Sequence, residues 1–66
     1  MGNYELAVDA YEMSLKDKPN ETWVLENLVR AQWAVGKKDA ASAALLKIRA
    51  LDAEMATKLE AELAKQ

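Results

Sequence analysis

The best candidates for a catalytic nucleophile in this 66-residue sequence are hydroxyl groups, because the chain contains neither Cys nor His. A serine or threonine hydroxyl becomes a strong nucleophile only beside a general base. With no histidine to serve as that base, we expect the hydroxyls on the predicted helices to be solvated or packed rather than reactive. They are those of Ser14, Ser42, Thr22 and Thr57.

Carboxylate pairs are the second chemistry to consider. Glu5 with Asp9, and Glu60 with Glu62, are spaced closely enough to resemble the acid and base of a hydrolase. Such a pair needs an enclosed pocket that raises one pKa, and a few short helices do not build one. No Asp-rich calcium loop, Gly-rich phosphate loop or metal-ligand spacing is found. The sequence therefore predicts no enzyme and no cofactor.

Charge and hydropathy exclude two further classes of partner. The chain has 9 Lys plus Arg against 11 Asp plus Glu, a net charge of −2, and these charges are spread along it. Nucleic-acid binding needs a clustered basic face, and a membrane span needs roughly 20 apolar residues in a row. We therefore expect no nucleic-acid partner and no membrane insertion. The absence of Cys fits the cytoplasm, which is slightly favoured, and also the periplasm, so the compartment stays open.

Three residues that break helices divide the chain, and abundant Ala, Leu, Glu and Lys favour an all-α fold. They are Gly2, Pro19 and Gly36, which leave segments 3–18, 20–35 and 37–66. The first helix is predicted over about 3–17. One stripe of it is apolar, at Tyr4, Ala7, Val8, Tyr11 and Leu15.

The second helix is predicted to start at Asn20, whose side chain would accept a hydrogen bond from the next turn. It should end at Gly36 in the left-handed conformation that glycine adopts cheaply. Its apolar stripe is wide, with Leu25 and Val29 on the flanks, which indicates contact on more than one side. The centre of that stripe is Trp23, Val24, Leu28, Ala31 and Val35.

A third helix should begin near residue 37 or 38 and bury Ala41, Ala44, Leu45 and Ile48. Asp52 is the only plausible cap before a fourth helix, in which Met55, Leu59 and Leu63 form a narrower apolar line. Neither Gly nor Pro occurs after residue 36, so one continuous helix through Asp52 is the alternative. The break is preferred, because an isolated long helix would need a partner for both faces.

The chain also repeats itself. A shift of 34 positions pairs Gly2 with Gly36, Ala7 with Ala41, Ala10 with Ala44, Leu25 with Leu59, and Glu26 with Glu60. With this period, the order Gly2, Tyr4, Ala7, Tyr11, Pro19, Asn20 resembles the tetratricopeptide repeat (TPR) family.

The resemblance covers nearly the whole chain and implies a single TPR-like domain over 1–66, an α-solenoid fragment of antiparallel helical hairpins. Residues 2–20 look like the second helix of a partial repeat, 21–53 like a near-complete repeat, and 54–66 like a closing helix. The family's core positions in the fuller repeat correspond to Trp23, Leu25, Leu28, Ala41, Leu45 and Ile48. Three residues depart from the pattern: Val29 replaces a small residue, Gln32 an aromatic, and Ala53 a proline.

In TPR proteins the first helix of each repeat lines a groove that binds a peptide. The resemblance places these residues of this chain in that groove: Trp23, Glu26, Asn27, Arg30, Trp33 and Ala34, joined by Thr57, Glu60, Ala61 and Ala64. Asn27 matches the asparagine with which chaperone-binding members hold a peptide carboxylate. The lysine and arginine of that clamp are missing, because Thr57 and Ala61 stand in the fourth helix, so we do not expect a carboxylate clamp.

Three side chains of the second helix have alternative roles. Trp23 and Trp33 lie ten positions apart, on roughly one side of a helix, and either fill the core or form an aromatic contact surface. Arg30 can pair with a partner's carboxylate or with Glu26 four residues earlier, and the internal pair is preferred.

The expected function is that of a protein–protein interaction module, a scaffold or adaptor for a peptide or protein partner. The resemblance also leaves the first helix without its own partner helix, which would bare Ala7, Tyr11 and Ser14. The alternatives are a self-association element that forms a homodimer through these residues, possibly by helix exchange, or an excised fragment of a longer array without a function of its own.

Overall fold

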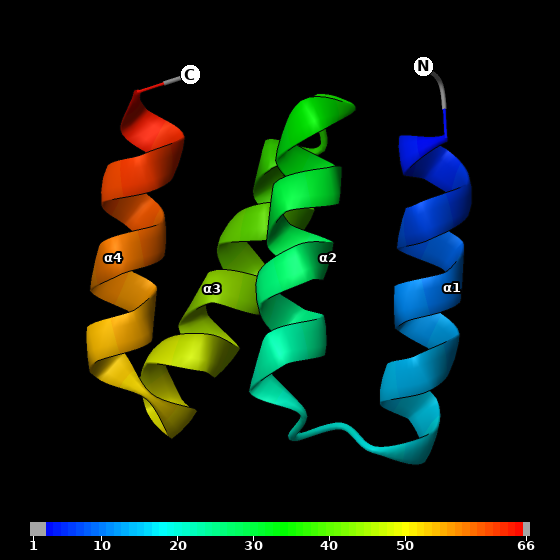
Figure 1. Ribbon diagram of the computed structural model, residues 1–66, viewed down its shortest axis with the longest axis horizontal. Coiled ribbons are helices and arrows are strands. Elements are labelled where there is room, and N and C mark those ends of the chain that lie inside the picture. The colour runs from blue at the N-terminus through cyan, green and yellow to red at the C-terminus, as the bar shows by residue number, and fades with distance from the viewer. Residues whose placement is uncertain (1–2, 66) are drawn as a thin grey trace.

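The computed structural model describes residues 3–65, which form four α-helices and no strand (Figure 1). The helices are α1 (Tyr4–Asp17), α2 (Thr22–Ala34), α3 (Lys38–Leu51) and α4 (Ala53–Ala64). Successive helices run antiparallel and are joined by short turns. The predicted all-α class and its helical hairpins are confirmed.

Helix α2 is the centre of the arrangement. Figure 1 shows α1 and α4 on its two sides, with α3 behind α2 and α4. Among the described residues α1 packs against α2 alone, whereas α3 packs against both α2 and α4. No helix within 3–65 is long and apolar enough to cross a membrane.

Two apolar clusters hold the helices together, one on each side of α2. The larger joins α2, α3 and α4, and its buried members are Leu25, Val29, Ala41, Ala44, Leu45, Ile48, Ala56, Leu59 and Leu63. The smaller joins α1 to α2 through Val8, Leu28 and Ala31. All four core positions predicted for the third helix are buried, and Leu59 and Leu63 of the fourth are buried as expected.

The position of the buried face of α2 corrects the sequence prediction. Leu25 and Val29, expected on the flanks, are 2% and 0% exposed, whereas Trp23, expected near the centre, is 59% exposed. Since α1 and α3 pack on α2 from different directions, two adjoining stripes of the helix are buried. Trp23 falls on the remaining open side, so its assignment as a core residue is wrong.

The turn between α1 and α2 differs from the expected cap. The amide of Lys18 donates to the Ser14 carbonyl (3.0 Å) and that of Glu21 to the Lys18 carbonyl (3.4 Å). Glu21 rather than Asn20 is the N-cap of α2, and no side chain caps this end. Because the turn occupies residues 18–21, Asn20 lies one residue too early to reach the free amides, and the predicted cap is wrong.

Gly36 ends α2 as predicted. Its φ of 85° is left-handed. The Gly36 amide donates to the Trp33 carbonyl (3.1 Å) and the Lys37 amide to the Gln32 carbonyl (2.8 Å), the paired bonds of a Schellman motif. This closure satisfies two carbonyls at the end of α2 and reverses the chain into α3.

The break between α3 and α4 is present, and the continuous-helix alternative is excluded. Asp52 has extended backbone angles, φ −156° and ψ 91°, and its Oδ1 accepts a hydrogen bond from the Met55 amide at 3.1 Å. A carboxylate there also favours the positive end of the α4 dipole. The bend returns α4 to the core, where Ala56 is fully buried and Met55 half-buried.

Candidate interaction surface

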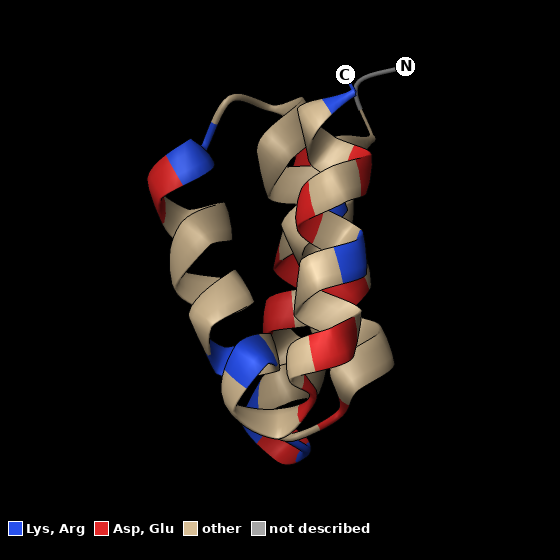
Figure 2. Cartoon of the chain, turned by 90° about the vertical axis from the view of Figure 1, so that its left-hand side faces the viewer, with Lys and Arg blue, Asp and Glu red and all other residues tan. Residues whose placement is uncertain are grey.

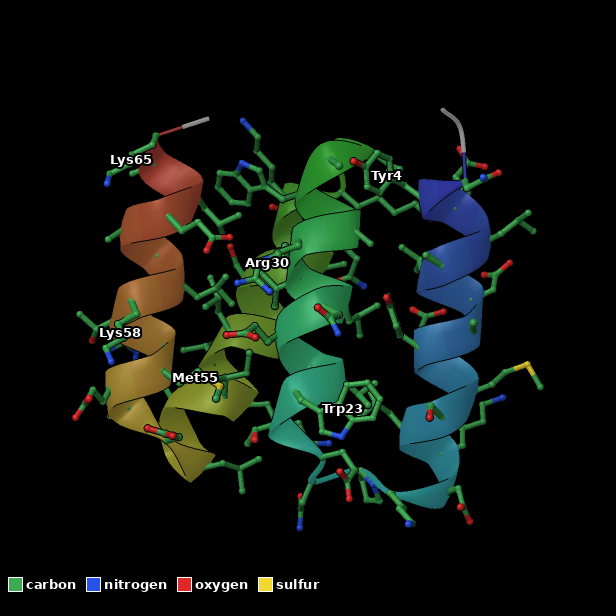
Figure 3. The ribbon with its side chains drawn as sticks, viewed as in Figure 1. Tyr4, Trp23, Arg30, Met55, Lys58 and Lys65 are labelled. Carbon is green, nitrogen blue, oxygen red and sulfur yellow. The ribbon has the colours of Figure 1, made fainter. Side chains whose placement is uncertain are left out.

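The side of α2 that faces away from α3 carries five of the ten residues that the sequence assigned to partner binding. Trp23 and Ala34 are exposed on it, while Glu26, Asn27 and Arg30 are half-buried. These five residues are called the α2 face below. Figure 3 shows Trp23 near the start of α2 and Arg30 towards the middle of the same helix.

Trp23 is held in one orientation although it is exposed. Its indole Nε1 donates a hydrogen bond to Oε2 of Glu21 at 2.8 Å. This bond satisfies the polar edge of the ring and leaves much of its apolar surface in water. Large aromatic side chains of this kind are the residues most enriched at the centres of protein–protein contacts.

Arg30 joins α2 to α4. Its Nε and Nη2 donate to Oε2 and Oε1 of Glu62 at 2.6 and 3.0 Å, a bidentate pair. Its Nη1 lies 3.3 Å from Oε1 of Glu26 and donates to Oδ1 of Asn27 at 3.5 Å. The predicted pairing with Glu26 is confirmed, but the stronger geometry belongs to Glu62, which the sequence analysis did not place on this surface.

The charges of this network stabilise each other. The hydrogen bond from Arg30 holds the pKa of the Glu62 carboxyl below its ordinary value. The same bond, helped by the charge of Glu26, raises the pKa of the Arg30 guanidinium. Arg30 is therefore engaged by two carboxylates of its own chain, and a partner's carboxylate would have to displace one of them.

Trp33 does not join Trp23 on one surface. It is half-buried and packs against the larger apolar cluster, with Nζ of Lys38 5.0 Å from its ring centroid. Positions ten apart on an α-helix differ by about 80° in direction, which is enough to place one ring on the core and the other in solvent. Of the two roles left open for the tryptophans, Trp33 takes the first, because it packs on the core, whereas Trp23 is exposed and does not fill the core.

The fourth helix contributes to the α2 face differently from the expectation. Thr57 is exposed and donates its hydroxyl to the Ala53 carbonyl at 3.1 Å. The Glu60 carboxylate pairs with Arg49 of α3. Glu62, not Glu60, therefore extends from α4 towards α2. The only clue in the sequence was the charge of Glu62, because no local pattern sets the register between two helices whose paired residues, Arg30 and Glu62, are 32 positions apart.

The residues assigned to self-association lie only partly where they were expected. Ala7 and Tyr11 are half-buried against the smaller cluster, and Ser14 is exposed. The large exposed apolar side chains of α1 are instead Tyr4, Leu6 and Met13, of which Leu6 and Met13 are the most exposed, at 68% and 69%. The expectation that Ala7 and Tyr11 form an exposed stripe is therefore wrong. Because α2 covers the side of α1 that carries Tyr11, the opposite side of α1 is exposed.

A hollow of about 360 Å³ lies at the other end of α2 from Trp23, lined by Gly36, Lys37, Lys38, Asp39 and Ala40. It does not include any residue predicted for partner binding. Comparison with protein-family models, with curated proteins and with solved structures gives no match to this chain. The arrangement on α2 is therefore interpreted from its own chemistry.

Proposed function

We propose that this chain is a protein–protein interaction module of TPR type, which binds a peptide or a segment of another protein on the α2 face. The observation that carries the proposal is Trp23, 59% exposed and oriented by its hydrogen bond to Glu21. Covering such a ring on binding gains several times the free energy of covering a small side chain. The repeat pattern around Gly2 and Gly36 supports the same class of protein.

The chemistry of the α2 face indicates which partner fits. Arg30 already pairs with Glu26 and Glu62, so the guanidinium is not a ready receptor for a C-terminal carboxylate. The exposed ring of Trp23 offers an apolar contact instead. We therefore expect a peptide that inserts an aliphatic or aromatic side chain against Trp23 and does not depend on a terminal carboxylate.

A displayed library of random peptides tests this proposal. Peptides enriched on the wild-type chain should bind Trp23→Ala at least about tenfold more weakly, a typical loss for an interface tryptophan. The matched control is Leu51→Ala, which removes an exposed apolar side chain from α3. Peptides that bind Trp23→Ala as well as wild type, or a library from which nothing is enriched, would contradict the proposal.

Fluorescence provides a second readout for the same peptides. The chain has two tryptophans, so Trp33→Phe leaves Trp23 as the only indole. Binding on the α2 face should shift the emission of this variant to shorter wavelength, because the exposed ring leaves water. An enriched peptide that binds Trp33→Phe without such a shift contacts another surface.

A second candidate function, self-association, is favoured by the exposure of Leu6 and Met13 on α1. Monomeric proteins rarely leave a continuous apolar stripe in water.

A further inference from the structure

The outer face of α1 is apolar in addition to its packed face. Leu6, Ala10 and Met13 are exposed and recur at four- and three-residue spacing, which aligns them along one side of the helix. Val8 and Leu15, which pack towards α2, lie on the opposite side. Along the chain, the side chains of this stripe are large at Leu6, small at Ala10 and large at Met13.

The outer face of α3 has the reverse pattern. Ala43, Leu46 and Ala50 are exposed on the side away from the buried Ala44 and Ile48, and Leu46 is 69% exposed. Along this stripe the order is small, large, small. Figure 2 shows α3 at the left, with an uncharged stretch between a charged start and a basic end.

The two stripes match when the helices are laid antiparallel. The spacings of residues 6, 10 and 13 are four and three, and those of residues 50, 46 and 43 are also four and three. Leu6 then faces Ala50, Ala10 faces Leu46, and Met13 faces Ala43. Large side chains meet alanines at all three levels, as interdigitating helices require.

The charges of the two helices are also complementary. Helix α1 contains four acidic residues and one lysine, a net charge of −3. Helix α3 contains Lys38, Lys47 and Arg49 against Asp39, a net charge of +2, of which Arg49 also pairs with Glu60 of its own chain. Opposite fields of this kind attract the two surfaces and disfavour pairing of α1 with another α1.

We propose that the outer face of α1 binds the outer face of α3 in a second copy of this chain, with the two helices antiparallel and Leu46 seated over Ala10. The contact forms between copies because α1 and α3 do not pack together within one chain. It joins two different surfaces, so each added copy presents one free α1 face or one free α3 face unless a ring closes. The interface is one helix face wide, which makes the association weak.

Exchanging the large and small residues at the centre of the contact tests the proposal. In sedimentation equilibrium over about a hundredfold range of concentration, the wild-type mass should rise with concentration. Ala10→Leu should weaken the association about tenfold by a clash, and Leu46→Ala should weaken it similarly by removing the inserted side chain. The double variant should recover most of the wild-type association, because the new leucine fills the space that Leu46 vacates.

Ala61→Leu is the matched control, because it enlarges an exposed alanine on α4 and should leave the association unchanged. All the substituted positions are exposed, so circular dichroism should report an unchanged helix content. A monomer at every concentration would overturn the proposal. So would a double variant that associates no better than the single variants, or an Ala10→Leu variant that associates more tightly than wild type. The α2 face is a separate surface, so failure here leaves peptide binding at Trp23 intact.

Discussion

Gln32 is the only buried polar side chain among the described residues. It is 4% exposed, and its Oε1 has no hydrogen-bond partner in the structure. A buried acceptor without a protein hydrogen-bond partner is destabilising. Gln32 lies on α2 between the buried Val29 and the half-buried Trp33, so an apolar side chain would suit its position.

Replacing Gln32 by leucine should therefore stabilise the chain by about 1 kcal/mol, since the unsatisfied amide is removed and the volume is nearly kept. In a domain of this size that corresponds to a rise of about 4–8 °C in melting temperature. Thermal and urea unfolding would measure it. Gln32→Ala should gain less, because it leaves a cavity. A Gln32→Leu variant that melts below wild type would mean that the amide has a stabilising partner.

At the level of elements, the bend between α3 and α4 is stabilised by the Asp52 side chain and by the packing of α4. Neither Gly nor Pro occurs near Asp52, and its flanking residues, Leu51 and Ala53, are both compatible with a helix. The carboxylate bond to the Met55 amide is what favours the bent form. Burial of Ala56 and Leu59 against the core also favours the bent form, so the cap and the packing of α4 act together.

Asp52→Ala should lower the free energy of unfolding by about 1 kcal/mol, the usual loss for an N-cap. It should also favour a straight α3–α4 helix, whose last part packs on another copy, so that the sedimenting mass doubles even at low concentrations at which wild type is a monomer. Asp52→Asn is the control, because an asparagine oxygen can accept the same hydrogen bond. If Asp52→Ala and Asp52→Asn unfold at the same urea concentration, the cap does not hold the bend.

At the level of the whole molecule, the Arg30–Glu62 pair joins α2 to α4, and both helices also contribute to the larger apolar cluster with α3. The pKa of Glu62 is lowered in the folded chain by the hydrogen bond from Arg30. A lowered pKa means that the folded state favours the charged carboxylate. The stabilisation is thus complete above the ordinary pKa of a glutamate and is lost as the pH falls through the lowered value.

Urea unfolding at a series of acid pH values would measure this dependence. Wild type should lose stability more steeply than Glu62→Gln as the pH drops below the ordinary glutamate range, because the glutamine variant has no carboxylate to protonate there. The effect is small, since the pair is exposed. Glu54→Gln, which removes the partner of Lys58 on the surface of α4, should keep the wild-type slope. Equal slopes for wild type and Glu62→Gln would contradict the assignment.

The features that the sequence alone determined are those that act within one or two turns of chain. Gly36 ends α2 through its left-handed backbone angle, and Asp52 begins α4 through the hydrogen bond that its side chain accepts. Both helix ends were therefore predictable. The core of α3 was predictable too, because Ala41, Ala44, Leu45 and Ile48 form a single narrow stripe. The pairing of Arg30 with Glu26 follows from their spacing on one helix.

Only the tertiary structure decided which side of α1 and of α2 is open. Apolar residues cover more than one stripe of each helix, so periodicity predicts a helix without stating which stripe is packed. That ambiguity left the role of Trp23 open between the core and a contact surface, and left Leu6 and Met13 unnoticed. The second carboxylate that pairs with Arg30, that of Glu62, could not be predicted for a related reason. Glu62 reaches it only after the bend at Asp52 and the packing of α4 have set the register between helices far apart in the chain.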